Sequence, residues 1–120
     1  PRSLINLLLK NLKKGKKFKL SNPDTANDFV HVDDVNKAID KLLIAKFKNG
    51  IYEIGSGKTN SVNNFAYYVE NILFKKNKYY RKIKDENNNI FAANTKKINS
   101  VAKVRFKSLK NGLIRTIKKC

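Results

Sequence analysis

Apolar residues recur at helical spacing in four segments of the chain. The first covers about residues 3–14, and Gly15 follows it as a C-terminal cap. The second begins at Asp33, a residue type that caps helices, and runs to about Phe47. Ser61 and Ser108 each precede a further periodic stretch, and we expect them to cap the third and fourth helices.

Shorter elements are predicted between these helices. Residues 17–20, 29–32 and 51–54 are apolar, β-branched or alternating, which is typical of short strands. Residues 79–83 and 89–93 fit either strands or loops, and Asn94 or Thr95 opens a brief helix to about Ala102. Because helices and short strands interleave, the sequence predicts a mixed α/β fold. A chain of 120 residues has room for one domain at most.

The chain is strongly basic, with 27 Lys and Arg against 9 Asp and Glu and a formal net charge of +18. Lys far outnumbers Arg, although specific phosphate and base recognition favours the planar Arg side chain. The lysines are also spread over every segment, as on a solvated surface. A small basic nucleic-acid-binding module therefore remains an alternative, supported by the charge and by the pairs Tyr67-Tyr68 and Tyr79-Tyr80.

The sequence has few features that indicate where in the cell the protein is located. The longest aliphatic run is residues 7–9, far below the roughly 20 residues of a membrane span. No secretion signal begins at Pro1, and the single cysteine, Cys120, forms no disulfide framework. We expect a cytoplasmic protein without membrane association. The missing start Met suggests a piece of a longer protein.

Motifs typical of catalytic and cofactor sites are incomplete. In the stretch that includes Gly57-Lys58-Thr59, Tyr52 replaces one glycine of a phosphate-binding loop and Asn60 replaces the third glycine of a dinucleotide loop. We expect a tight connection with positive φ there. Tyr80 and Lys84 have the Tyr-xxx-Lys spacing of dehydrogenases, but no apolar helix carries them.

The remaining candidates for chemistry are also explained structurally. His31 is the only histidine and lacks further ligands, so we expect it to be buried and hydrogen-bonded. Helix capping and the helix dipole account for Asp33 and Asp34. The sequence predicts no catalytic residue and no metal site in this chain.

Several ordered motifs carry a family resemblance. They are NDFVHVDDVNKAI at 27–39, GIYEIGSG at 50–57, SVNNFA at 61–66, Tyr80-Arg81, ANTKKI at 93–98 and SLKNGL at 108–113. Over essentially its whole length the chain resembles the NAD-dependent epimerase/dehydratase family, the extended short-chain dehydrogenases that act on nucleotide sugars. The matching motifs are those of the carboxy-terminal part of that family.

The resemblance implies that residues 1–120 form the carboxy-terminal, nucleotide-sugar-binding part of such an enzyme, an incomplete α/β domain lacking the Rossmann half. The intact enzyme would use NAD or NADP at C4 of a nucleotide sugar, as an epimerase, dehydratase or reductase of carbohydrate biosynthesis. Its partners would be the nucleotide-sugar substrate, the missing amino-terminal Rossmann half and, as often in the family, a second subunit in a homodimer. The fragment alone would bind no cofactor and be inactive.

The resemblance also implies positions that hold the substrate: Ser3, Leu4, Phe18, Leu20, Asn27, Arg81 and Asp85, or Glu86 in place of Asp85. Phe18 and Leu20 would lie beside the base, Arg81 near the diphosphate, and Asp85 or Glu86 near the ribose. Asn27 replaces a family arginine and so removes a positive charge, for which Lys19 or Lys82 would compensate.

Overall fold

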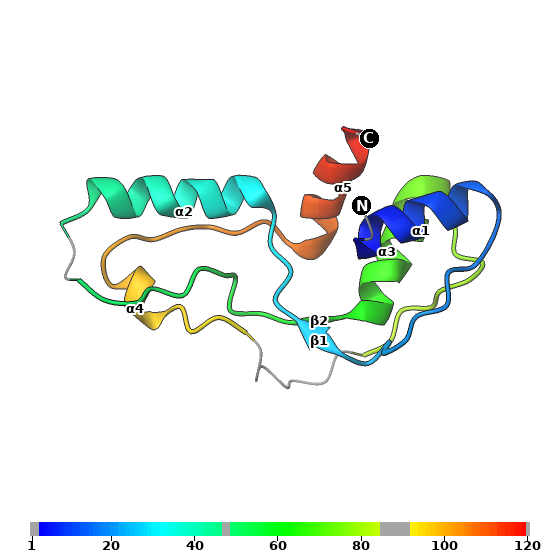
Figure 1. Ribbon diagram of the computed structural model, residues 1–120, viewed down its shortest axis with the longest axis horizontal. Helices are drawn as coiled ribbons and strands as arrows, with labels where there is room; N and C mark the ends of the chain where they lie inside the picture. Colours follow the sequence, from blue (N-terminus) through cyan, green and yellow to red (C-terminus); the bar gives the residue numbers. More distant parts are fainter. Residues whose placement is uncertain (1–2, 47–48, 85–91, 120) are drawn as a thin grey trace.

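The computed structural model describes residues 3–46, 49–84 and 92–119. Its elements are α1 (Leu4–Lys13), β1 (Ala26–Asn27), α2 (Val32–Ile44), β2 (Asn60–Ser61), α3 (Val62–Phe74), α4 (Lys96–Asn99) and α5 (Leu109–Lys118). The molecule is elongated, with extents of 51 × 30 × 24 Å. Figure 1 shows a helical cluster of α1, α3 and α5 at one end and, at the other, an arm formed by residues 28–46, 49–59 and 92–107.

Two of the four predicted long helices begin at the serine expected to cap them, Ser61 or Ser108, and the first helix begins after Ser3, a cap that the sequence analysis did not name. The Oγ atoms of Ser3, Ser61 and Ser108 accept the N–H of the residue three positions later, at 3.4, 3.1 and 3.2 Å. At the end of α1, Gly15 has a φ of 69°, and the N–H of Lys16 reaches the Asn11 carbonyl at 2.9 Å. This closing geometry requires a residue that tolerates the left-handed region, so Gly15 ends α1 as predicted.

The start of α2 differs from the prediction. His31, not Asp33, is its N-cap, because the His31 Nδ1 accepts the Asp33 N–H at 3.1 Å. Asp33 and Asp34 lie within the first turn, where their charge favours the helix dipole. The helix ends at Ile44, and the predicted last residue, Phe47, lies outside the described residues. The brief helix α4 exists but is shorter than expected.

The strands predicted over 17–20, 29–32 and 51–54 are wrong. Within the described residues the sheet is a two-residue antiparallel ladder, in which Ala26 faces Ser61 and Asn27 faces Asn60. A strand needs a neighbouring backbone, and at Phe18 both the N–H and the carbonyl are instead bonded to the Tyr80 hydroxyl. Residues 79–83, predicted as strand or loop, form a loop.

The core lies where α1, α3 and α5 meet. Its buried members are Leu8, Leu9, Leu12, Phe65, Ala66, Val69, Tyr80 and Leu113. Among the described residues, no helix is long and apolar enough to cross a membrane. The fold thus joins this apolar core to an arm that lies largely outside it and contacts it through Phe29, whose ring packs on Phe65.

Candidate functional site

A groove on the helical cluster brings together three of the residues predicted to hold a substrate. Leu4 comes from the first turn of α1, whereas Phe18 and Leu20 come from the segment that follows this helix. The groove has a volume of about 360 Å³, and its other lining residues are Leu7, Ser21, Asn22, Thr25 and Val62. An apolar floor with a few polar groups at the rim is typical of a small-molecule site.

Tyr80 fixes the position of Phe18 in this groove. The tyrosine is buried in the core, and its hydroxyl accepts the Phe18 N–H at 3.1 Å while donating to the Phe18 carbonyl. Burial raises the pKa of the Tyr80 phenol, so the hydroxyl keeps the proton that it donates. Residues 80–84 are not helical, so Tyr80 and Lys84 do not share a helix face as a dehydrogenase pair would.

Arg81 follows Tyr80 and is exposed. Its carbonyl accepts a hydrogen bond from the Asn63 Nδ2 at 2.8 Å. Asn63 is the neighbour of Val62, which lines the groove, so the backbone of Arg81 is anchored at the helix turn that borders the groove. Arg81 does not itself line the groove, and its tie to this region is the backbone hydrogen bond from Asn63.

The other predicted substrate positions have different environments. Ser3 caps α1, so its hydroxyl serves the helix. Asn27 lies in β1 opposite Asn60 and is not among the residues that line the groove. Asp85 and Glu86 lie outside the described residues. Of the lysines expected to compensate for Asn27, Lys82 lies over the Tyr68 ring, 5.7 Å from its centroid.

Sequence reasoning missed two buried polar residues of α3. Asn64 and Glu70 are both almost fully buried, and both bind the loop that carries Arg81. They belong to a polar stripe on α3 formed by Asn63, Asn64, Glu70 and Asn71. Asn63 and Glu70, like Asn64 and Asn71, are seven residues apart, so the four side chains lie on one side of the helix. That spacing was the available signal.

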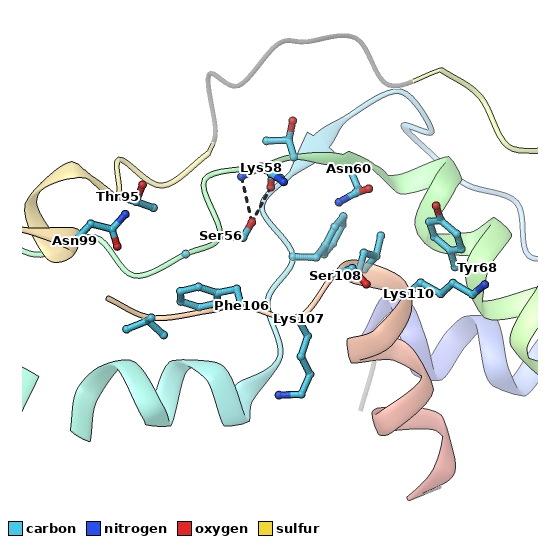
Figure 2. A pocket seen from close by; sticks show the side chains of 15 residues that line it. Ser56, Lys58, Asn60, Tyr68, Thr95, Asn99, Phe106, Lys107, Ser108 and Lys110 are labelled. Carbon is cyan, nitrogen blue, oxygen red and sulfur yellow. Dashed lines mark hydrogen bonds between the residues drawn. The ribbon is translucent and has the colours of Figure 1, made fainter. Parts of the chain in front are cut away.

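A larger cavity lies between the arm and the start of α5, and Figure 2 shows its lining side chains. Its volume is about 580 Å³, and its lining includes Ser56, Lys58, Tyr68, Phe106, Lys107 and Lys110. Two of its polar groups already hold the arm together. The Ser56 hydroxyl donates to Asp28 at 2.5 Å, and the Lys107 ammonium pairs with Asp34 at 2.7 Å.

The loop formed by Gly55, Ser56 and Gly57 serves a carboxylate of this chain. The two carboxylate oxygens of Asp28 accept the N–H groups of Ser56, Gly57 and Ala93 at 3.2, 3.0 and 3.1 Å. Gly57 has the predicted positive φ, 77°. A Cβ at Gly55 would lie 2.7 Å from an Asp28 oxygen, so glycine is needed there for close approach. The amide groups that would cradle a phosphate are thus directed at Asp28.

His31 matches its structural prediction, since only 6% of its side chain is exposed and its Nδ1 accepts the Asp33 N–H. Asp33 also pairs with Arg115 at 2.6 Å, which lowers the pKa of the Asp33 carboxyl despite the opposing effect of desolvation. Across residues 3–46, 49–84 and 92–119, no three His, Cys, Asp or Glu side chains are grouped to hold a metal ion.

Comparison with known proteins finds likenesses among solved structures. No protein-family profile matches the sequence, and neither does any curated protein. The fold is similar to that of WbmF from Bordetella bronchiseptica, an enzyme whose crystal structure contains NAD+ and UDP, with a TM-score of 0.66 and 20% identity. The match covers 98% of this chain and 35% of WbmF. The chain therefore has a mixed α/β fold related to part of WbmF, and it spans about a third of that enzyme's length.

Proposed function

We propose that this chain is the nucleotide-sugar-binding part of an NAD(P)-dependent epimerase, dehydratase or reductase that acts at C4 of the sugar. The observation that carries the proposal is the groove, which unites Leu4, Phe18 and Leu20. The Arg81 backbone is bonded to Asn63, the residue after Val62 in the groove lining, and we propose that the Arg81 side chain extends toward the groove. The related fold of WbmF, whose crystal structure contains NAD+ and UDP, supports it.

Each part of the groove suits one part of a nucleoside diphosphate. Leu4, Phe18 and Leu20 offer apolar surface to the base. The backbone of Phe18 is occupied by Tyr80, so polar groups at the rim, such as Ser21 and Asn22, would bind the edge of the base. Arg81 offers two parallel N–H donors to the diphosphate, and such charge-assisted pairs are among the stronger hydrogen bonds.

The rest of the enzyme would be supplied by an amino-terminal Rossmann half that binds NAD or NADP. The exposed apolar side of α2 supports a partner of this kind, since Val32, Ile39 and Leu43 are in contact with solvent. The loop of Gly55, Ser56 and Gly57 is directed at Asp28, so it offers no phosphate cradle for the cofactor. We therefore expect no NAD turnover by the 120-residue chain alone, and turnover with a nucleotide sugar would contradict this part of the proposal.

The test of substrate binding is calorimetric titration of the 120-residue chain with UDP at about 0.15 M salt, where charges beyond about 8 Å are largely screened. Arg81→Ala is expected to raise the Kd about tenfold or more, because a charge-assisted hydrogen bond contributes about 1.5–3 kcal/mol. Arg105→Ala removes the same charge from another exposed position and is the matched control. Absence of UDP binding, or an equal effect of both substitutions, would contradict the proposal.

The same two variants test the nucleic-acid alternative. Binding of mixed-sequence DNA with a steep salt dependence, weakened equally by Arg81→Ala and Arg105→Ala, would favour a basic nucleic-acid-binding module. In the structure, Tyr79 and Tyr80 give the nucleic-acid alternative little support. Tyr80 is buried, and the Tyr79 hydroxyl donates to the Gly15 carbonyl at 2.6 Å, so both contact the protein itself.

A further inference from the structure

Glu70 is a buried carboxylate that binds backbone amides. Only 1% of the residue is exposed. Its Oε1 accepts the N–H groups of Lys78 and Tyr79 at 2.7 and 2.9 Å. Its Oε2 accepts the Tyr80 N–H at 2.9 Å and the Asn77 Nδ2 at 3.2 Å. One side chain of α3 therefore holds four donors from the loop that leads to Arg81.

The backbone after Tyr80 is held by the same helix. The Asn63 Nδ2 donates to the Arg81 carbonyl at 2.8 Å. The Asn64 side chain accepts the Ile83 N–H at 2.9 Å and donates to the Ile83 carbonyl at 2.8 Å. Glu70 thus fixes the chain just before Arg81, and the two asparagines fix it at and after Arg81. A backbone ordered in advance lowers the entropy cost of placing a side chain on a ligand.

We propose that Glu70 is a positioning residue for Arg81, which it directs at the diphosphate of the bound nucleotide by fixing the backbone of residues 78–80. This inference rests on the function proposed above. The carboxylate is suited to the task because its two oxygens together accept all four bonds. A glutamine would present one oxygen and one NH₂ group, and the NH₂ group cannot accept an N–H. Glu70→Gln therefore removes some of the hydrogen bonds to the loop while nearly preserving the side-chain volume.

The effect on the diphosphate can be separated from an effect on folding. The quantity to measure is the ratio of the Kd for uridine to the Kd for UDP, determined by calorimetry below the melting temperature of each variant. A purely structural loss raises both Kd values together, since it lowers the folded fraction of the protein. Displacement of Arg81 raises the Kd for UDP alone, because uridine has no diphosphate.

We expect Glu70→Gln to lower this ratio about tenfold, the amount that corresponds to loss of a charge-assisted hydrogen bond. Asn63→Ala, a change at the helix surface, is expected to lower it in the same direction with little change in melting temperature. Asp40→Asn makes the same carboxylate-to-amide change at an exposed position of α2 and should leave the ratio unchanged. In the background of Arg81→Ala, Glu70→Gln should lower the ratio no further.

Two different failures can be told apart. If the wild-type chain does not bind UDP, the proposed function is wrong and this inference falls with it. If the wild-type chain binds UDP, but Glu70→Gln and Asn63→Ala keep the wild-type ratio, the function stands and the positioning role is overturned. A ratio that falls in the Arg81→Ala background as well would also overturn it, since Glu70 would then act independently of Arg81.

Discussion

The helical cluster and the arm are held together in different ways. In the cluster, side chains of α1, α3 and α5 form one closed apolar core around Leu8, Leu12 and Val69. In the arm, two carboxylates bind backbone amides of distant segments: Asp28 holds the loop at Ser56, and Asp34 accepts the Lys107 N–H at 2.7 Å. The apolar side of α2 meanwhile remains exposed, with Leu43 75% accessible.

This difference shows which part of the fold is complete in itself. Burial of apolar area is the main favourable term in folding, and the cluster has it. In the arm, Ala38 and Ile98 are also buried, but the connections are fixed by hydrogen bonds, each of which contributes only about 1 kcal/mol net. The candidate groove is on the cluster, where Leu4 and Val62 extend from its helices. The groove proposed to bind substrate therefore lies on the part of the molecule with the larger apolar core.

The strongest test of this difference between the cluster and the arm is to replace one leucine by alanine in each of them. Leu8 is fully buried and Leu43 is mostly exposed, although both lie on helices. Leu8→Ala is expected to lower the free energy of unfolding by about 2–5 kcal/mol, because it removes buried apolar surface and leaves a cavity. Leu43→Ala should change it by about 0.5 kcal/mol or less. Urea denaturation measures both, and similar losses would show that the apolar side of α2 is covered in solution.

The two regions also differ in how far the sequence predicts them. In the cluster, the apolar period identifies three helices and the serines at positions 61 and 108 identify the start of two of them, since caps and amphipathic faces are local properties. In the arm, residues 51–54 alternate like a strand, but strand pairing depends on a neighbouring backbone that local pattern does not specify. The cap of α2 was misassigned for a similar reason, because Asp33 is the commoner capping residue type and His31 takes that position.

The candidate site was predicted only in part. Leu4, Phe18 and Leu20 were named from a family resemblance, and the structure places them in one groove. The residues that hold this arrangement, Glu70 and Tyr80, are joined to their partners across the tertiary fold. From sequence alone, a glutamate on an amphipathic helix is assigned to the exposed side, because the backbone amides that would bind it when buried are not known. Periodicity alone could not therefore assign Glu70 its role.

A pH titration tests whether carboxylates stabilise the arm. Burial alone would raise the pKa of Asp34, but hydrogen bonds from the Lys107 side chain and N–H and the charges of Lys107 and Lys37 outweigh it and lower this pKa. A lowered pKa stabilises the fold above the ordinary Asp value of about 3.9, and this stabilisation is lost as the pH falls through the lowered pKa. We expect Asp34→Asn to cost about 1–3 kcal/mol at pH 6.

The same difference in stability between wild type and Asp34→Asn should shrink as the pH falls below about 4 through the lowered pKa of Asp34, because a protonated Asp34 is neutral, as asparagine is. Urea denaturation across this range measures it, and hydrogen exchange at the Lys107 amide locates the change in the arm. Asp24→Asn, at an exposed turn position, is the control and should show little difference at any pH. A difference that does not shrink at all as the pH falls would mean that Asp34 acts through packing and not through its charge.

The smallest expected effect concerns the contact where the cluster meets the arm. Gly112 lies within α5 against His31, and a Cβ there would lie 3.5 Å from the His31 Cβ, an ordinary van der Waals distance. Gly112→Ala should therefore stabilise the protein by about 0.5–1 kcal/mol, because alanine loses less backbone entropy in a helix. Gly15→Ala makes the same change at a φ of 69° and should destabilise it by a similar amount.

Thermal unfolding distinguishes these two alanine substitutions by the sign of the shift in melting temperature. A lower melting temperature for Gly112→Ala would show that α5 and the start of α2 pack more tightly than their separation indicates. The arm would then share in the packing of the cluster through His31. A higher one, with Gly15→Ala lower, would mean that the junction has room for a methyl group beside His31, so the contacts that join the arm to the core lie elsewhere, at the Phe29 ring on Phe65 and at the ion pair of Asp33 with Arg115.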